Sequence, residues 1–162
     1  MFCCAHLSAA TTAVITATNK PAPLSPAPLP PAPCLVIGVG CRRGCPVEHL
    51  AELLARVLAE QRLAQEAIIG LASIALKAGE PGLLALAEQL RRPLQFYPGE
   101  RLLACSARLS QRSERVLALT GCHGVAESAA LALADTLGQG PSRLLVTRQS
   151  SAMASLAIAV PC

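Results

Sequence analysis

An apolar segment that runs directly into a loop of glycine and arginine does most to limit the folds open to this chain. Residues 34–39 (CLVIGV) are continuously apolar and rich in β-branched side chains, as in a central strand buried on both faces. Residues 46–61 then repeat apolar side chains at helical spacing, behind a proline that suits a first helical turn. The segment GVGCRRG, residues 38–44, therefore carries the chain from the carboxyl end of a strand to the start of a helix.

The same strand, loop and helix recur in outline downstream. A second strand is predicted over 67–74, a loop over 77–82, a helix over 83–90 and a third strand over 94–97. This alternation predicts parallel pairing with right-handed crossovers, and hence a single α/β domain over residues 34–162.

The last third of the chain adds two helices and two strands. Residues 126–137 predict an Ala- and Leu-rich helix that ends at Gly138. Residues 113–119 suit either a short helix or a strand, and the helix is favoured because Ser113 can cap it. Strands over 144–147 and 154–160, joined by a short polar loop, complete a mixed, mainly parallel sheet of about five strands with at least one antiparallel pairing.

Residues 1–33 differ from the rest of the chain. Seven of the thirteen prolines fall between Pro21 and Pro33, in a Pro/Ala/Leu tract that favours polyproline II over helix or sheet. We expect a disordered leader here, or a true start codon further downstream.

Composition removes several classes of function. Aromatic residues make up only 2% of the chain and the net charge is +4 without a dense basic run, so a nucleic-acid site is not predicted. Asp135 is the one aspartate among ten acidic residues, which argues against carboxylate-rich metal sites. No apolar run reaches the ~20 residues of a membrane-spanning helix, and the N-terminus makes a weak signal peptide. We therefore predict a cytoplasmic protein with reduced thiols, without a membrane partner.

Loops that follow parallel strands meet at one edge of the sheet, where ligands bind. Arg42 and Arg43 should meet Lys77 and Glu80 there, with segment 121–127 also near. Free N–H groups at a helix start beside two guanidiniums favour carboxylates or phosphates. The alternative is a tight turn that needs its glycines for backbone geometry, with solvated arginines.

Other chemistries have weaker support. The spacing of Gly38, Gly40 and Gly44 is similar to a dinucleotide fingerprint, but no acidic ribose ligand ends the second strand. His123 lies in a flexible loop where an acid or base would be useful, although a loop histidine chosen for its backbone tolerance is the favoured interpretation. A zinc set of Cys41, Cys45, Cys122 and His123 is conceivable, but Cys41 and Cys45 have a C-x3-C spacing instead of the C-x2-C of common zinc sites. No metal or other cofactor is predicted.

Four ordered segments resemble one known family. They are GVGCRRG at 38–44, LKAGEPGL at 76–83, GVAESAAL at 124–131 and AIA at 157–159. Their order and spacing are similar to the family formed by CobE and the C-terminal domain of CbiG, which belongs to cobalamin (vitamin B12) biosynthesis. The resemblance covers nearly all of residues 34–160 and implies a three-layer α/β/α fold.

The resemblance also implies a ligand: a precorrin or a corrin such as hydrogenobyrinic acid, a large apolar ring fringed with carboxylates. The family usually has a lysine and a threonine where this chain has Arg148 and Ser155, so charge and hydroxyl are kept. The substrate-binding residues that we predict are Gly38, Gly40, Cys41, Arg42, Arg43, Gly44, Lys77, Glu80, Arg148 and Ser155.

Three functions follow from these predictions. The first is an accessory protein of the aerobic pathway that binds an intermediate for other cobalamin-pathway enzymes. The second, implied by the hydrolytic activity of CbiG proteins, is hydrolysis of a precorrin lactone or acyl group, with Glu127 or His123 activating water. The third is an NADP-binding oxidoreductase.

Overall fold

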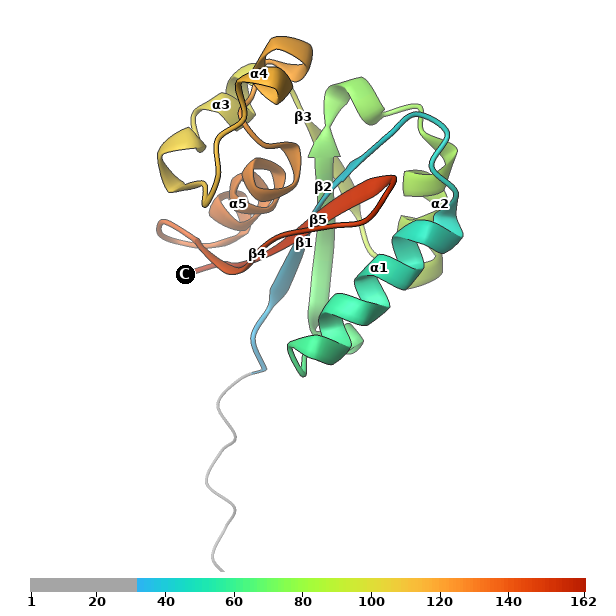
Figure 1. Cartoon of the computed structure of the whole chain (residues 1–162). Helices are drawn as coiled ribbons and strands as arrows, with labels where there is room; N and C mark the ends of the chain where they lie inside the picture. The colour runs from blue at the N-terminus through green and yellow to red at the C-terminus, as the bar shows by residue number, and fades with distance from the viewer. Residues whose placement is uncertain (1–31) are drawn as a thin grey trace, which may run out of the picture. The chain divides into compact units, whose positions relative to one another are not determined.

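The computed structural model describes residues 32–162, so the predicted leader lies outside the described residues except for its last two positions. One five-stranded sheet with the strand order β3-β2-β1-β5-β4 organises this part of the chain (Figure 1). Its strands are β1 (Leu35–Cys41), β2 (Ile68–Ile74), β3 (Leu94–Tyr97), β4 (Arg143–Ser150) and β5 (Ala154–Val160).

The strand directions decide which loops meet. β1 pairs in parallel with β2, and β2 with β3, whereas β5 is antiparallel to both of its neighbours, β1 and β4. Four of the five strands therefore point the same way, which confirms the mixed, mainly parallel sheet. Cys41 at the end of β1 lies opposite Ala154 at the start of β5, so the β4–β5 hairpin joins the edge where the parallel strands end.

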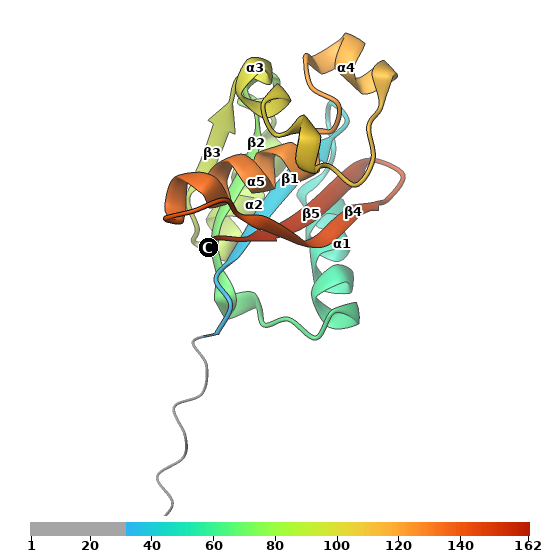
Figure 2. The same ribbon diagram turned by 90° about the vertical axis from the view of Figure 1, so that its left-hand side faces the viewer.

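Helices cover both faces of the sheet and give the three layers that were expected (Figure 1). One face carries α1 (Val47–Glu60) and α2 (Pro81–Leu90), and the other carries α5 (Val125–Leu137). Figure 2 shows α5 across its face of the sheet, with α3 (Gly99–Leu103) and α4 (Glu114–Thr120) on the same side. Short 3-10 turns cover Gln65–Ala67, Ala75–Lys77 and Ser106–Arg108.

β1 is the centre of the core. Leu35, Ile37 and Val39 are fully buried in the cluster on the α1 and α2 side, and Val36 is fully buried in the cluster on the α5 side. α5 packs closely on β1 because position 38 is glycine: a methyl group there would lie 1.8 Å from the carbonyl oxygen of Ala126. β1 is thus fixed from both faces, and its end is a rigid base for the loop that follows.

Two parts of the chain differ from expectation. α3 and the turn Ser106–Arg108 were not predicted, because elements of five and three residues are too short to show helical periodicity. Pro46 is the N-cap residue of α1 and does not lie in its first turn as predicted. α2 begins at Pro81, before the predicted start at residue 83, and Pro81 occupies its first turn. Segment 113–119 is helical as favoured, and the Ser113 hydroxyl accepts a hydrogen bond from the Val116 amide at 3.3 Å.

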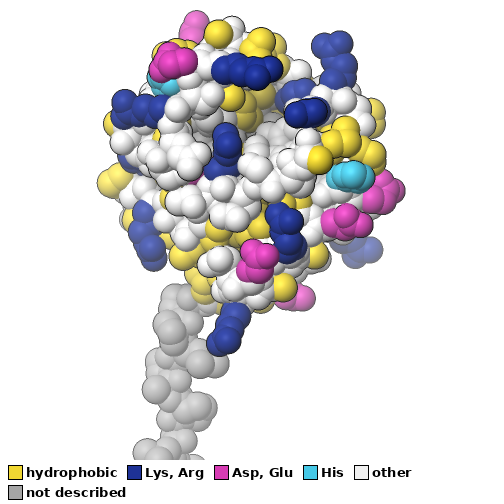
Figure 3. Space-filling model, viewed as in Figure 1, with side chains coloured by type: hydrophobic (Ala, Val, Ile, Leu, Met, Phe, Trp, Pro, Cys, Tyr) yellow, Lys and Arg dark blue, Asp and Glu magenta, His cyan; other side chains and the backbone are white. Residues whose placement is uncertain are grey.

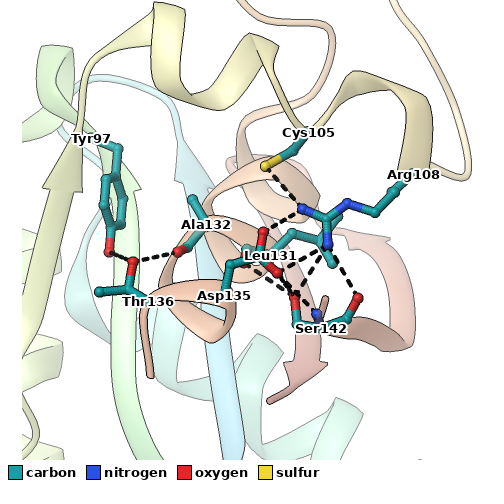
Figure 4. A network of polar contacts seen from close by, with 8 residues as sticks. All are labelled: Tyr97, Cys105, Arg108, Leu131, Ala132, Asp135, Thr136 and Ser142. Carbon is teal, nitrogen blue, oxygen red and sulfur yellow. Dashed lines mark hydrogen bonds and ion pairs between the residues drawn. The ribbon is translucent and has the colours of Figure 1, made fainter. Parts of the chain in front are cut away.

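A polar network holds the turn Ser106–Arg108 against the carboxyl half of α5 (Figure 4). The Arg108 guanidinium donates to both carboxylate oxygens of Asp135, and Ser142 donates to the same carboxylate from its amide at 2.9 Å and its hydroxyl at 2.5 Å. Partial burial alone would raise the pKa of Asp135, but the hydrogen bonds from Arg108 and Ser142 outweigh it and lower the pKa to about 2. The one aspartate of the chain therefore has a structural task.

Within residues 32–162, no single helix combines the length and apolarity that crossing a membrane requires; α4 and α5 meet that test only as a pair bent by 67°. Ala126 to Ala134 of α5 are buried inside the domain.

Candidate functional site: a cationic crevice at the carboxyl edge of the sheet

Two neighbouring clefts lie where the parallel strands end. Both are lined by Gly40, Cys41 and Val125, so they share a floor. The first, called here the Arg42 cleft, has a volume of about 370 Å³ and adds Arg42, Val116, Gly124, Arg148, Ser155 and the hairpin 150–154. The second, the Arg43 cleft, has a volume of about 390 Å³ and adds Arg43, Ile74, Leu76, Lys77, Leu119 and Thr120. Together they form one crevice with a cationic group on each side.

Three arginines around this crevice are available to a ligand. Arg42, Arg43 and Arg148 are exposed, and within residues 32–162 none of their guanidiniums makes a hydrogen bond or an ion pair. Figure 3 shows Lys and Arg side chains around a hollow in the upper part of the surface. Free guanidiniums beside an apolar floor are suited to bind carboxylates of a ligand whose body is apolar.

Packing explains why position 40, on the shared floor, is glycine. A methyl group on Gly40 would lie 2.9 Å from the Ser155 hydroxyl oxygen and 3.4 Å from the Val125 Cβ, so any larger residue would crowd the base shared by the two clefts. With Gly38 packed against α5, both glycines of β1 are explained by packing. Neither is needed to bring a cofactor phosphate close to the backbone, which removes the main support for a dinucleotide site.

Glu80 fixes the glycine/arginine loop from the neighbouring loop. This carboxylate is only 9% exposed; it accepts a hydrogen bond from the Gly44 amide at 2.9 Å and lies 3.6 Å from the Lys77 Nζ. Gly44 has φ +72°, in the region that favours glycine, and the Arg42 amide donates to the Met153 carbonyl at 2.8 Å. The loop is therefore held in place on two sides, and the Glu80 side chain is occupied within the protein.

Cys41 lies on the shared floor but is not activated. Burial raises the pKa of its thiol to about 11; the positive charge of Lys77 lowers the pKa by less, and Cys45 and Glu80 raise it further. The thiol is therefore protonated near neutral pH, and a protonated thiol is a poor nucleophile.

Glu127, a predicted catalytic residue, is 3% exposed and lines neither cleft. Its carboxylate accepts hydrogen bonds from the Ser110 amide at 2.8 Å, from the Ser110 hydroxyl, and from the Arg148 amide at 2.8 Å. It thus connects the segment before α4 to β4, the strand that carries Arg148. These contacts occupy the carboxylate, which leaves it little capacity to activate a water molecule.

His123, the other predicted catalytic residue, also lines neither cleft. Its side chain is 16% exposed, and its Nδ1 lies 3.5 Å from the Glu114 Oε1 without forming a hydrogen bond among residues 32–162. In the same part of the chain, no three His, Cys, Asp or Glu side chains gather into a group that could hold a metal ion.

The structure brings seven of the predicted binding residues into the crevice: Gly40, Cys41, Arg42, Arg43, Lys77, Arg148 and Ser155. Gly38, Gly44 and Glu80 support the crevice from outside its lining. The prediction missed the apolar walls formed by Leu76, Val116 and Leu119, and the hairpin 150–154. The sequence does predict a polar loop between these two strands, but its position at the crevice becomes known only when β5 is placed between β4 and β1.

The fold and the crevice define a small α/β domain with a cationic crevice at the carboxyl edge of its sheet. The sequence model of the family described as "Cobalamin synthesis G C-terminus" matches residues 35–159, and the chain belongs to this family. Within it, the chain is a cobalamin-biosynthesis protein of the CobE type.

Relatives and solved structures support this assignment. The chain is 41% identical to "Protein CobE" of Sinorhizobium sp over 78% of this chain and 80% of that protein. A crystal structure of CobE, a protein from the cobalamin (vitamin B12) biosynthetic pathway, is 45% identical, with a TM-score of 0.77 over 85% of this chain and 97% of that one. A cobalt-precorrin-5A hydrolase of Salmonella typhimurium is 46% identical over 42% of this chain, but the match covers only 19% of that enzyme.

Proposed function

We propose that the crevice binds a precorrin or corrin intermediate of cobalamin biosynthesis, with one edge of the ring at each cleft. One observation carries this proposal: guanidiniums without a hydrogen bond or ion pair among residues 32–162 stand on both sides of a shared apolar floor. A corrin precursor has the complementary chemistry, since its ring is apolar and its acetate and propionate side chains are anionic. Arg42 and Arg148 would hold carboxylates on one side, and Arg43 with Lys77 on the other.

The protein binds this intermediate without converting it. Three features support binding over hydrolysis: the thiol of Cys41 is protonated near neutral pH, the carboxylate of Glu127 is occupied by three donors, and His123 stands outside the crevice lining. The portion matched to the hydrolase of Salmonella typhimurium is a small part of that enzyme. The role is therefore accessory, with the bound intermediate presented to a pathway enzyme.

A titration of the full chain with hydrogenobyrinic acid tests this proposal. Binding should change the visible absorption spectrum of the corrin and should weaken as salt is raised, because charged groups make the contacts. Mass spectrometry of the recovered ligand should find it unchanged. Absence of any spectral change or heat of binding refutes the proposal. Incubation with a lactone-bearing precorrin tests hydrolysis separately, and recovery of the ring-opened, hydrated product would replace binding by hydrolysis.

A further inference from the structure

We propose that Leu76 and Leu119 form an apolar clamp that holds the face of the ring in the Arg43 cleft. This inference rests on the proposed function and adds the residues that recognise the body of the ligand, as distinct from its carboxylates. Both leucines line this cleft, and they are the two most exposed large apolar side chains of residues 32–162, at 68% and 71%.

The pair is unusual because no other large apolar side chain of residues 32–162 is exposed to this extent. The remaining exposed large apolar side chains are between 36% and 52% exposed, and none of them lines either cleft: Leu84, Leu103, Leu137 and Leu145. Single exposed leucines are ordinary on protein surfaces, whereas two that share one cavity mark a binding site.

The two leucines reach the cleft from different elements. Leu76 lies in the 3-10 turn Ala75–Lys77 directly after β2, and Leu119 lies in α4, two residues before the glycine that ends the helix. Figure 1 shows the turn after β2 and α4 at the same end of the sheet. A flat ligand that enters between these elements meets one leucine from each.

The charged residues of the same cleft define the ligand further. Arg43 and Lys77 line it beside the leucines, so the cavity combines two aliphatic contacts with two cationic groups. The aromatic residues of the described chain, Phe96 and Tyr97, line neither cleft, so no aromatic ring is available there to stack on a nucleobase. The combination fits a disc-shaped ligand with apolar faces and an anionic rim.

α4 is packed loosely enough for a bound ligand to stabilise it. None of its residues is buried, and it ends at Gly121 with φ +79°. Contact between the ring and Leu119 would bury an apolar side chain that is otherwise exposed, and the amides of this helix should then exchange more slowly with solvent.

The test uses the full chain and hydrogenobyrinic acid, with Leu76→Ser and Leu119→Ser compared to a matched control, Leu137→Ser. Each cleft variant should weaken binding about tenfold, since that is the effect of losing one partly buried leucine. The control should stay within about twofold, because Leu137 is 52% exposed outside both clefts. The salt dependence of binding should be unchanged by the leucine substitutions and reduced by Arg43→Ala, because only the arginine contact is ionic.

Hydrogen exchange provides a second readout. Saturating ligand should protect residues 113–121 in the wild type, and Leu119→Ser should lose this protection while its unfolding midpoint is unchanged. Wild-type affinity in both cleft variants refutes the clamp alone and leaves the proposed function standing. Absence of binding by the wild type refutes both.

Discussion

Replacement of Glu127 by glutamine separates a structural role of this side chain from a catalytic one. The carboxylate is 3% exposed and accepts three hydrogen bonds, two at one oxygen and one at the other. Glutamine keeps one acceptor oxygen, but its amino group would face a donor. Loss of a hydrogen bond to a charged group, with a donor left opposite another donor, costs about 2 to 3 kcal/mol. We expect the urea midpoint to fall by about 1 M.

Ser128→Ala, the next residue of α5, is the control for this substitution. Ser128 is fully buried, and its hydroxyl has no hydrogen-bond partner among residues 32–162, so alanine should leave the stability unchanged or raise it. Binding by Glu127→Gln should weaken together with its stability, because the same carboxylate holds the backbone of Arg148. A variant with the wild-type midpoint, normal binding and a lost turnover of precorrin would refute this reasoning and make Glu127 a general base.

Three further predictions concern other parts of the domain. The lowered pKa of Asp135 gives stability that is complete above its ordinary value of 3.8 and is lost as pH falls toward 2. Asp135→Asn should remove about 1 to 2 kcal/mol of unfolding free energy at neutral pH and reduce the loss of stability between about pH 4 and 2, as measured by urea unfolding at each pH. An unchanged loss of stability over this pH range would contradict the prediction. Gly38→Ala should lower the free energy of unfolding by at least about 3 kcal/mol, because its methyl would lie 1.8 Å from a carbonyl oxygen of α5. A methyl at Gly79 meets nothing within 4 Å, so Gly79→Ala should leave the melting temperature unchanged. Equal melting temperatures for the two variants would refute the packing argument. At neutral pH, iodoacetamide should alkylate Cys41, with its pKa of about 11, more slowly than the exposed Cys162; peptide mass spectrometry that finds Cys41 faster would mean that this thiol is activated.

Much of the fold was predictable from the sequence because its signals are local. The apolar run of β1 and the apolar stripe of α1 each lie within one element, and the parallel order of the first three strands follows from their alternation with helices. The partners of β4 and β5 were not predictable in this way. Their placement depends on β5 inserting beside β1, a contact between residues far apart in the sequence.

The candidate site was also predictable only where its signals are local in the sequence. Arg42, Arg43 and Lys77 were predictable because each follows a strand whose direction was already known. For Glu127, no sequence pattern revealed that Ser110 and the amide of Arg148 occupy its carboxylate. The difference between a free carboxylate and an occupied one depends on tertiary contacts.

The most direct test of the account is a calorimetric titration of the full chain with hydrogenobyrinic acid for the wild type, Arg42→Ala, Arg43→Ala and Arg143→Ala. Arg143 is exposed on β4 and lines neither cleft, so its removal changes the net charge equally without touching the crevice. The account predicts that each crevice arginine contributes about tenfold to a hundredfold in affinity, the usual effect of a hydrogen bond to a charged group. Arg143→Ala should bind like the wild type. Equal affinities for all four proteins would contradict the assignment of the ligand to this crevice.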